Sequence, residues 1–178
     1  MGTHLFIDET KAKSYVVVAV VCPDEALNPA RRSVGRLVLR GQRTIHMKNE
    51  SDRRRAQIAE AVCGLSDHGI TAHVLDAGRG PESELLRRER ALRAVVLLAA
   101  KQSPSSIVLD LDQTLVARDA RTLSSAIGEV AEPSITYSHD VSRSQPLLAL
   151  PDAIAWCWAR NRNWRRQIAP IISNVRDV

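Results

Sequence analysis

Aromatic residues, cysteines and long apolar runs are all scarce in this sequence, and each shortage excludes a class of protein. Only 3% of the 178 residues are aromatic, so a core must be built from valine, isoleucine, leucine and alanine. The cysteines Cys22, Cys63 and Cys157 are odd in number and far apart, which argues against a disulfide framework or a structural zinc site. The longest apolar runs, 15–22 and 94–100, are too short to span a bilayer.

The first residues lack both the basic start and the long apolar core of a signal peptide, so we expect a cytoplasmic protein without membrane contact. Hydrophobic residues make up 44% and charged residues 25%, which is typical of a globular chain. The length fits one core, and we expect a single domain over 1–178.

Positive charge is in excess, with a formal net charge of +5, and most of the cations are arginine. The planar guanidinium fork fits phosphate, so a polyanionic partner such as DNA or RNA is one interpretation. A GC-rich genome that encodes arginine in place of lysine is the other. Charge alone does not separate them.

Hydrophobic patterning predicts alternating strands and helices. The strands are expected at 4–7, 15–22, 70–75, 107–111 and 134–137, with a further short strand or extended piece at 44–48. The helices are expected at 29–39, 52–66, 82–102, 118–130 and 146–166. The strand at 107–111 precedes the helix at 118–130 in the sequence. Leu85 is placed on the apolar side of the third helix, and Pro151 could mark the start of the last. This order predicts an α/β layered domain with a mixed sheet.

Acidic residues lie where these elements end. Asp8 closes the first strand, Asp110 lies near the end of the strongest internal strand with Asp112 two residues on, and Asp152 lies in the first turn of the last helix. Strand ends of an α/β sheet meet at one edge, so distant acids can become neighbours. Clustered carboxylates repel one another, and Mg²⁺ or Mn²⁺ removes that conflict. A pair of such ions supports phosphodiester hydrolysis.

Simpler roles exist for the same residues. Asp8 could be a turn residue and Asp152 a helix cap, whereas Asp110 is harder to dismiss because it interrupts an apolar run. His46 and Lys48 would point to one face of an extended segment and could contact a phosphate or a ligating carboxylate. A solvated pair on an edge strand is the alternative.

Three segments resemble the small bacterial and phage proteins catalogued as domain of unknown function 3800. They are 6–9 followed by the strand 15–22, 45–48 ahead of a helix with three arginines, and 142–155, which contains Pro151-Asp152. The resemblance implies a ribonuclease H-like fold and a metal-dependent nuclease centre. Its acids, on the first strand, a central strand and the last helix, correspond to Asp8, Asp110 and Asp152. It makes Glu9, His46 and Asp112 second-tier candidates.

The sequence departs from that pattern at several points. The glutamine before the final acid is Ala149, the following alanine is Pro151, and the aspartate expected before Ser142 is Val141, with Asp140 shifted by one. A glutamate on the first helix has no clear counterpart. These departures leave the implied fold intact but weaken the case for nuclease activity.

Residues 107–115 also fit the haloacid dehalogenase signature, an apolar strand followed by DxDxT. In that interpretation Asp110 would be the nucleophile of a phosphatase and Asp112 the general acid. The motif belongs near the start of that fold and needs a later lysine, but the last lysine here is Lys101. We therefore treat the match as chance.

A module that binds nucleic acid or protein without catalysis is a further alternative. The expected terminal helix interleaves arginines and tryptophans that could contact phosphates and stack bases: Arg160, Arg162, Arg165, Arg166, Trp156, Trp158 and Trp164. An amphipathic helix with tryptophan in the core or at a dimer seam has the same pattern, which leaves a homodimer open.

Overall fold

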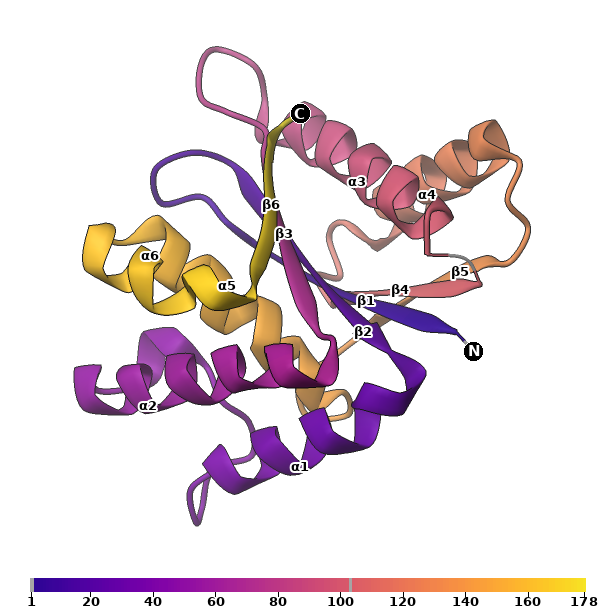
Figure 1. Cartoon of the computed structure of the whole chain (residues 1–178). Helices are drawn as coiled ribbons and strands as arrows, with labels where there is room; N and C mark the ends of the chain where they lie inside the picture. The colour runs from indigo at the N-terminus through magenta and orange to yellow at the C-terminus, as the bar shows by residue number, and fades with distance from the viewer. Residues whose placement is uncertain (1, 103) are drawn as a thin grey trace.

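The computed structural model describes residues 2–102 and 104–178 as a six-stranded mixed sheet with helices on both faces (Figure 1). The strands follow the order β5-β4-β1-β2-β3-β6 across the sheet. Their bounds are β1 Thr3–Thr10, β2 Val16–Pro23, β3 Thr71–Asp76, β4 Ser105–Asp110, β5 Ile135–Asp140 and β6 Ile172–Asp177.

Strand direction brings most of the carboxyl ends to one edge of the sheet. β2 is antiparallel to both β1 and β3, whereas β4 is parallel to β1, β5 to β4, and β6 to β3. Five strands therefore run the same way and β2 runs against them. Residues at the ends of β1, β4 and β5 become neighbours at one edge.

The helices divide between the two faces, with α3 and α4 covering one and α1, α2, α5 and α6 covering the other (Figure 1). Their bounds are α1 Leu27–Leu37, α2 Asp52–Cys63, α3 Glu84–Ala100, α4 Val116–Val130, α5 Ala149–Ala159 and α6 Arg162–Ile168. Short 3₁₀ turns connect them: η1 Asp24–Ala26, η2 Met47–Asn49, η3 Gly64–His68, η4 Pro146–Leu148 and η5 Ala169–Ile171. Within the described residues, no helix is both long and apolar enough to cross a bilayer.

Each face of the sheet has its own core, which explains the unbroken apolar run of β2. Val16, Val18 and Val20 pack against the α5 side, whereas Val17 and Val21 pack against the α3 side. Because successive side chains of a strand point to opposite faces, a strand buried on both faces is apolar throughout.

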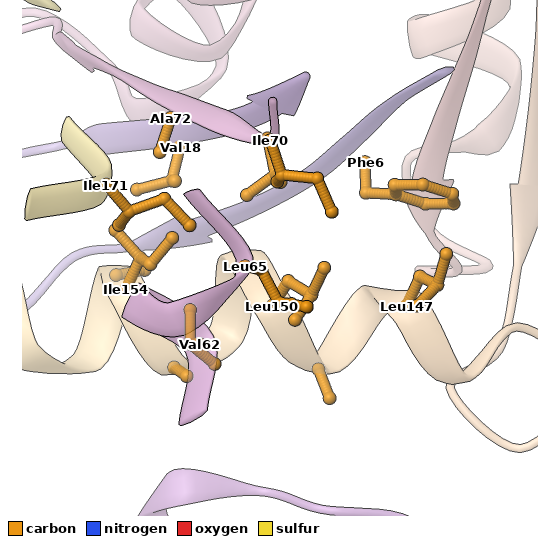
Figure 2. Packing of buried hydrophobic residues seen from close by; sticks show 14 of the residues in the cluster. Phe6, Val18, Val62, Leu65, Ile70, Ala72, Leu147, Leu150, Ile154 and Ile171 are labelled. Atoms are coloured by element: carbon orange, nitrogen blue, oxygen red, sulfur yellow. The ribbon is translucent and has the colours of Figure 1, made fainter. Parts of the chain in front are cut away.

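The helix α5 lies directly under the sheet. In Figure 2, Leu147, Leu150 and Ile154 point from η4 and α5 toward the strands, with Phe6 of β1 above Leu147. These side chains are at most 1% exposed. Burial of each such side chain contributes roughly 1.5–3 kcal/mol, which fixes α5 against β1 and β2.

The α/β class and the mixed sheet are confirmed, and most element bounds agree to within a few residues. Residues 44–48 form no strand: the chain is extended at His46 and then turns into η2, which buries Met47. Leu85 is 39% exposed, so its predicted place on the apolar side of α3 is wrong.

The segment 146–166 is mainly helical, as predicted, but it is not one terminal helix. It divides into η4, α5 and α6, because the backbone turns at Arg160 and the Asn161 side chain accepts hydrogen bonds from the next helix's first amides. Pro151 falls within the first turn of α5, where a missing N–H costs nothing. The strand β6 was not predicted, since most of its residues are polar and exposed and lack an alternating pattern.

Candidate functional site

Asp8 and Asp110 end up side by side on neighbouring parallel strands. The register pairs Ile7 with Leu109, so the next residue of each strand is an aspartate. Alternation places Asp8 on the same face as Phe6, and Asp110 on the same face as Val108, and both of those side chains belong to the core on the α5 side. Both carboxyl groups therefore lie on the face that α5 covers.

Asp152 reaches this edge from the first turn of α5. The helix packs on β1, and the half-buried Asp152 carboxylate accepts a hydrogen bond from the backbone N–H of Met47, 2.9 Å from Oδ2. The hydrophobic contacts of α5 thus bring a carboxylate from residue 152 to the electrostatic neighbourhood of Asp8 and Asp110.

Burial and mutual repulsion raise the pKa of these groups. Burial is the largest cause for Asp8, the charges of Asp152 and Asp110 add to it, and the pKa of Asp8 reaches about 8 although the Glu9 N–H donates to Oδ1 at 2.7 Å. Burial also raises the pKa of Asp110 and of Asp152, against hydrogen bonds from backbone N–H groups. At neutral pH the three carboxyl groups are not all ionised unless a cation offsets their charge.

The donor chemistry fits a hard divalent cation, because carboxylate oxygens are the ligands that Mg²⁺ and Mn²⁺ prefer. As the side chains stand in residues 2–102 and 104–178, no three of His, Cys, Asp or Glu form a group that could hold a metal ion. The aspartates are thus electrostatic neighbours without a formed coordination sphere.

Glu9 lies on the opposite face of the sheet. It pairs with Arg88 of α3, whose guanidinium also makes a two-pronged contact with Asp119 of α4 at 2.7 and 2.8 Å. His139 approaches the same Asp119 carboxylate at 3.1 Å. Arg88 is 5% exposed and Asp119 1%, so Glu9 belongs to a buried charge network between β1, α3 and α4.

The remaining predicted residues surround the edge in different ways. His46 lines a cavity next to Asp110, and a positive charge on its ring opposes the rise in the pKa of Asp110 and of Asp152. Lys48 is exposed on η2, and its positive charge also opposes the rise in the pKa of Asp152. Asp112 is exposed after β4 and accepts hydrogen bonds from the Thr114 N–H and hydroxyl, which lower its pKa.

The structure adds one acid that the sequence patterns did not mark as a site residue. Asp140 ends β5 and stands opposite Asp110 in the β4–β5 register. Its Oδ1 accepts the N–H of Val141 at 2.8 Å. The position of an acid at the end of a strand was the available signal, but the predicted strand stopped at residue 137.

Two cavities meet at Asp110. One, of about 440 Å³, lies between the chain before η2 and the loop after β5; the other, of about 510 Å³, lies between the β1–β2 hairpin and the start of the β4–α4 loop. Asp8 and Asp112 line the second. Asp110 is therefore accessible from two sides.

The tryptophans contact arginine side chains at the far end of α5. The guanidinium groups of Arg55 and Arg160 each lie 4.5 Å from the ring centroid of Trp156, and Trp164 meets that ring edge-on at 5.1 Å. Both tryptophans pack against the core. Arg160 directly follows α5, whereas the other three arginines of the predicted cluster belong to α6, so a turn of the backbone divides the cluster.

No family model matches the chain, and no curated protein matches it either. Among solved structures, the chain is similar to one in the complex of PCNA with RNase HII from Archaeoglobus fulgidus, with a TM-score of 0.59 and 19% sequence identity. The match covers 94% of this chain and 75% of that chain. At this identity the likeness shows the fold alone, which is ribonuclease H-like, as the resemblance implied.

Proposed function

We propose that this protein is a divalent-metal-dependent nuclease that hydrolyses phosphodiester bonds of DNA or RNA at the edge where β1, β4 and α5 meet. One observation carries the proposal: three aspartates from sequence-distant elements share one face and one electrostatic environment. The ribonuclease H-like fold and the basic net charge support it. Kinship with domain of unknown function 3800 remains part of the proposal.

Asp8, Asp110 and Asp152 would hold Mg²⁺ or Mn²⁺ after rotation of their side chains. The bound cation would supply charge neutralisation of the phosphodiester and a more acidic water. The Met47 N–H orients one Asp152 oxygen and leaves the other for a ligand. His46 and Lys48, beside Asp110 and Asp152, would attract and orient the phosphate, and Glu9 would keep Arg88 beside β1.

Cleavage assays test the proposal directly. Labelled single-stranded DNA, duplex DNA, RNA and RNA–DNA hybrid would be incubated with the protein and Mg²⁺, Mn²⁺ or EDTA. We expect metal-dependent cleavage of at least one substrate, lowered by about a hundredfold or more in Asp8→Asn, Asp110→Asn and Asp152→Asn. Asp67→Asn, an exposed acid on η3, is the matched control and should cleave normally.

The alternatives give different results in the same experiments. A binding module would retain salt-dependent affinity for nucleic acid in all variants and never cleave it. A phosphatase would hydrolyse a small phosphomonoester and lose this activity with Asp110→Ala but not with Asp8→Asn. The lowered pKa of exposed Asp112 argues against its use as a general acid. Cleavage that survives loss of Asp8 and Asp110 would refute the nuclease centre.

The remaining expectations belong to the same proposal. Arg160 and the arginines of α6 would contact the nucleic-acid backbone. Trp156 and Trp158 would not stack on bases, because guanidinium groups already cover their rings. We keep a cytoplasmic location and a single domain as expectations. A homodimer through the tryptophan-bearing segment is the alternative use of that surface.

A further inference from the structure

The cavity of about 440 Å³ beside Asp110 has an arginine on each of the two loops that form it. Arg43 comes from the segment between α1 and η2, and Arg143 comes from the loop after β5. The lining also contains the hydroxyl-bearing Thr44 and Ser142. Two segments that are a hundred positions apart thus present cations and hydroxyl donors to one space.

Neither arginine is engaged elsewhere. Both are exposed, and within residues 2–102 and 104–178 neither side chain has a hydrogen-bond or ion-pair partner. Some other arginines are neutralised by acids: Arg88 by Asp119 and Arg93 by Glu129, for example. Unpaired guanidinium groups beside a carboxylate-rich edge leave positive charge available for an anionic ligand.

The size and the walls of the cavity indicate which anion fits. Pockets that hold small organic ligands have volumes of roughly 300–1,000 Å³, so this one suits a nucleotide and exceeds the needs of a lone phosphate. Leu111 and the 36% exposed Val141 form an apolar wall that can contact a sugar or a base. A cavity of this volume has room for one nucleotide but not for a base pair together with both of its sugar-phosphate backbones.

We propose that this cavity is a subsite for the single-stranded nucleotide next to the bond to be cleaved, with Arg43 and Arg143 holding its backbone phosphate. The inference rests on the proposed function and adds the strand state of the substrate. Thr44 and Ser142 would donate to the same phosphate, and Leu111 and Val141 would contact the nucleoside. Asp110 lines this cavity and also belongs to the catalytic edge, so the phosphate held here would lie next to the reacting one.

Binding without cleavage tests the subsite. The full chain would be titrated in EDTA against a fluorescent single-stranded 12-mer, with anisotropy as the readout. We expect Arg43→Ala and Arg143→Ala each to weaken binding about tenfold, because a hydrogen-bonded phosphate contact is lost. The slope of log affinity against log salt should fall by about 0.7 per lost contact. Arg40→Ala, an exposed arginine three residues before Arg43, is the matched control.

Two competitors identify the ligand. Adenosine monophosphate should displace the 12-mer from the wild type but have little effect on the Arg43→Ala, Arg143→Ala double variant, and inorganic phosphate at the same concentration should displace much less. Equal competition by the two anions would mean that the apolar wall plays no part. Duplex DNA bound as tightly as the single strand, with equal dependence on the two arginines, would overturn the proposed strand preference.

The subsite and the nuclease proposal fail separately. One outcome is that no metal supports cleavage but both arginine variants bind the 12-mer more weakly than the wild type does. The subsite then stands and the nuclease proposal falls. If the wild type cleaves but both variants bind and cleave as Arg40→Ala does, the subsite falls and the nuclease stands. Melting temperatures equal to that of the wild type would show that exposed Arg43 and Arg143 do not act through folding.

Discussion

The backbone N–H of Met47 donates a 2.9 Å hydrogen bond to Oδ2 of Asp152, joining two residues that are 105 positions apart. The hydrogen bond is one of several contacts that join η2, α2 and α5. Arg55 donates to the carbonyl oxygens of Met47 and Lys48 at 2.8 and 3.1 Å, and its guanidinium lies over Trp156, one helical turn after Asp152. The orientation of Asp152 therefore depends on an arginine of α2.

Arg55→Ala should loosen η2 and release the Met47 amide. Loss of two hydrogen bonds to carbonyls and of the cation–π contact should lower the free energy of unfolding by about 1–3 kcal/mol. Amide hydrogen exchange at Met47 should accelerate about tenfold or more. Arg53→Ala, exposed on the same helix, should change neither quantity. Unchanged exchange at Met47 would show that η2 holds its place without Arg55.

The raised pKa of Asp8 makes stability depend on pH. The folded chain keeps the Asp8 proton up to about pH 8, whereas the group has a pKa of 3.8 when unperturbed, so the folded state binds more protons between these values. This contribution to stability is complete at low pH and is lost as the pH rises toward 8. Asp8→Asn should therefore raise the melting temperature by several degrees at pH 8 and by less at pH 5. An equal change at both pH values would contradict the assignment.

A divalent cation should offset the same repulsion. Mn²⁺ at about 100 times its dissociation constant would stabilise the folded wild type by about 2.7 kcal/mol, provided that it does not bind the unfolded chain. Asp8→Asn and Asp152→Asn should each abolish most of this gain at pH 8, and Asp67→Asn should keep it. Calorimetric titration should show protons released on binding, because the raised pKa leaves Asp8 partly protonated. Stabilisation that is equal in all the variants would place the ion elsewhere.

Arg88 should be among the most costly side chains to remove. Arg88→Met leaves the buried Asp119 carboxylate and Glu9 without their shared cation, which should cost about 3–5 kcal/mol of unfolding free energy. Urea titration measures the loss, and Arg90→Met on the exposed side of α3 should cost well under half as much. Adding Asp119→Asn to Arg88→Met should recover part of the loss. A double variant no better than the single one would show that charge burial is not the cause.

Ala131 is a place where substitution should stabilise. It follows α4 with a φ of 52°, in the left-handed region that glycine adopts without strain. Ala131→Gly should gain up to about 1 kcal/mol, offset in part by the greater freedom of glycine in the unfolded chain. Ala117→Gly, within α4, should instead lose roughly 0.5–1 kcal/mol. Differential scanning calorimetry of the two variants compares these opposite signs.

The sequence alone determined the layers of this protein. An apolar run such as 16–21 indicates a strand that is buried on both faces, and the spacing of apolar residues in the segments around it predicted helices that cover these faces. The acids Asp8 and Asp110 could be found in the same way, because each ends or interrupts an apolar run at a strand terminus. The spacing of apolar residues and the residues that end each apolar run are local properties of the sequence, so they can be recognised without the structure.

Only the tertiary structure decided which of those acids face one another. Alternation sends Asp8 to the α5 face and its neighbour Glu9 to Arg88 on the other, and that choice depends on the register of β1 against β2 and β4. The same packing set Asp140 opposite Asp110 and brought Arg43 and Arg143 to one cavity. Such contacts join residues far apart in the chain, and their partners are fixed by burial on folding rather than by any local pattern.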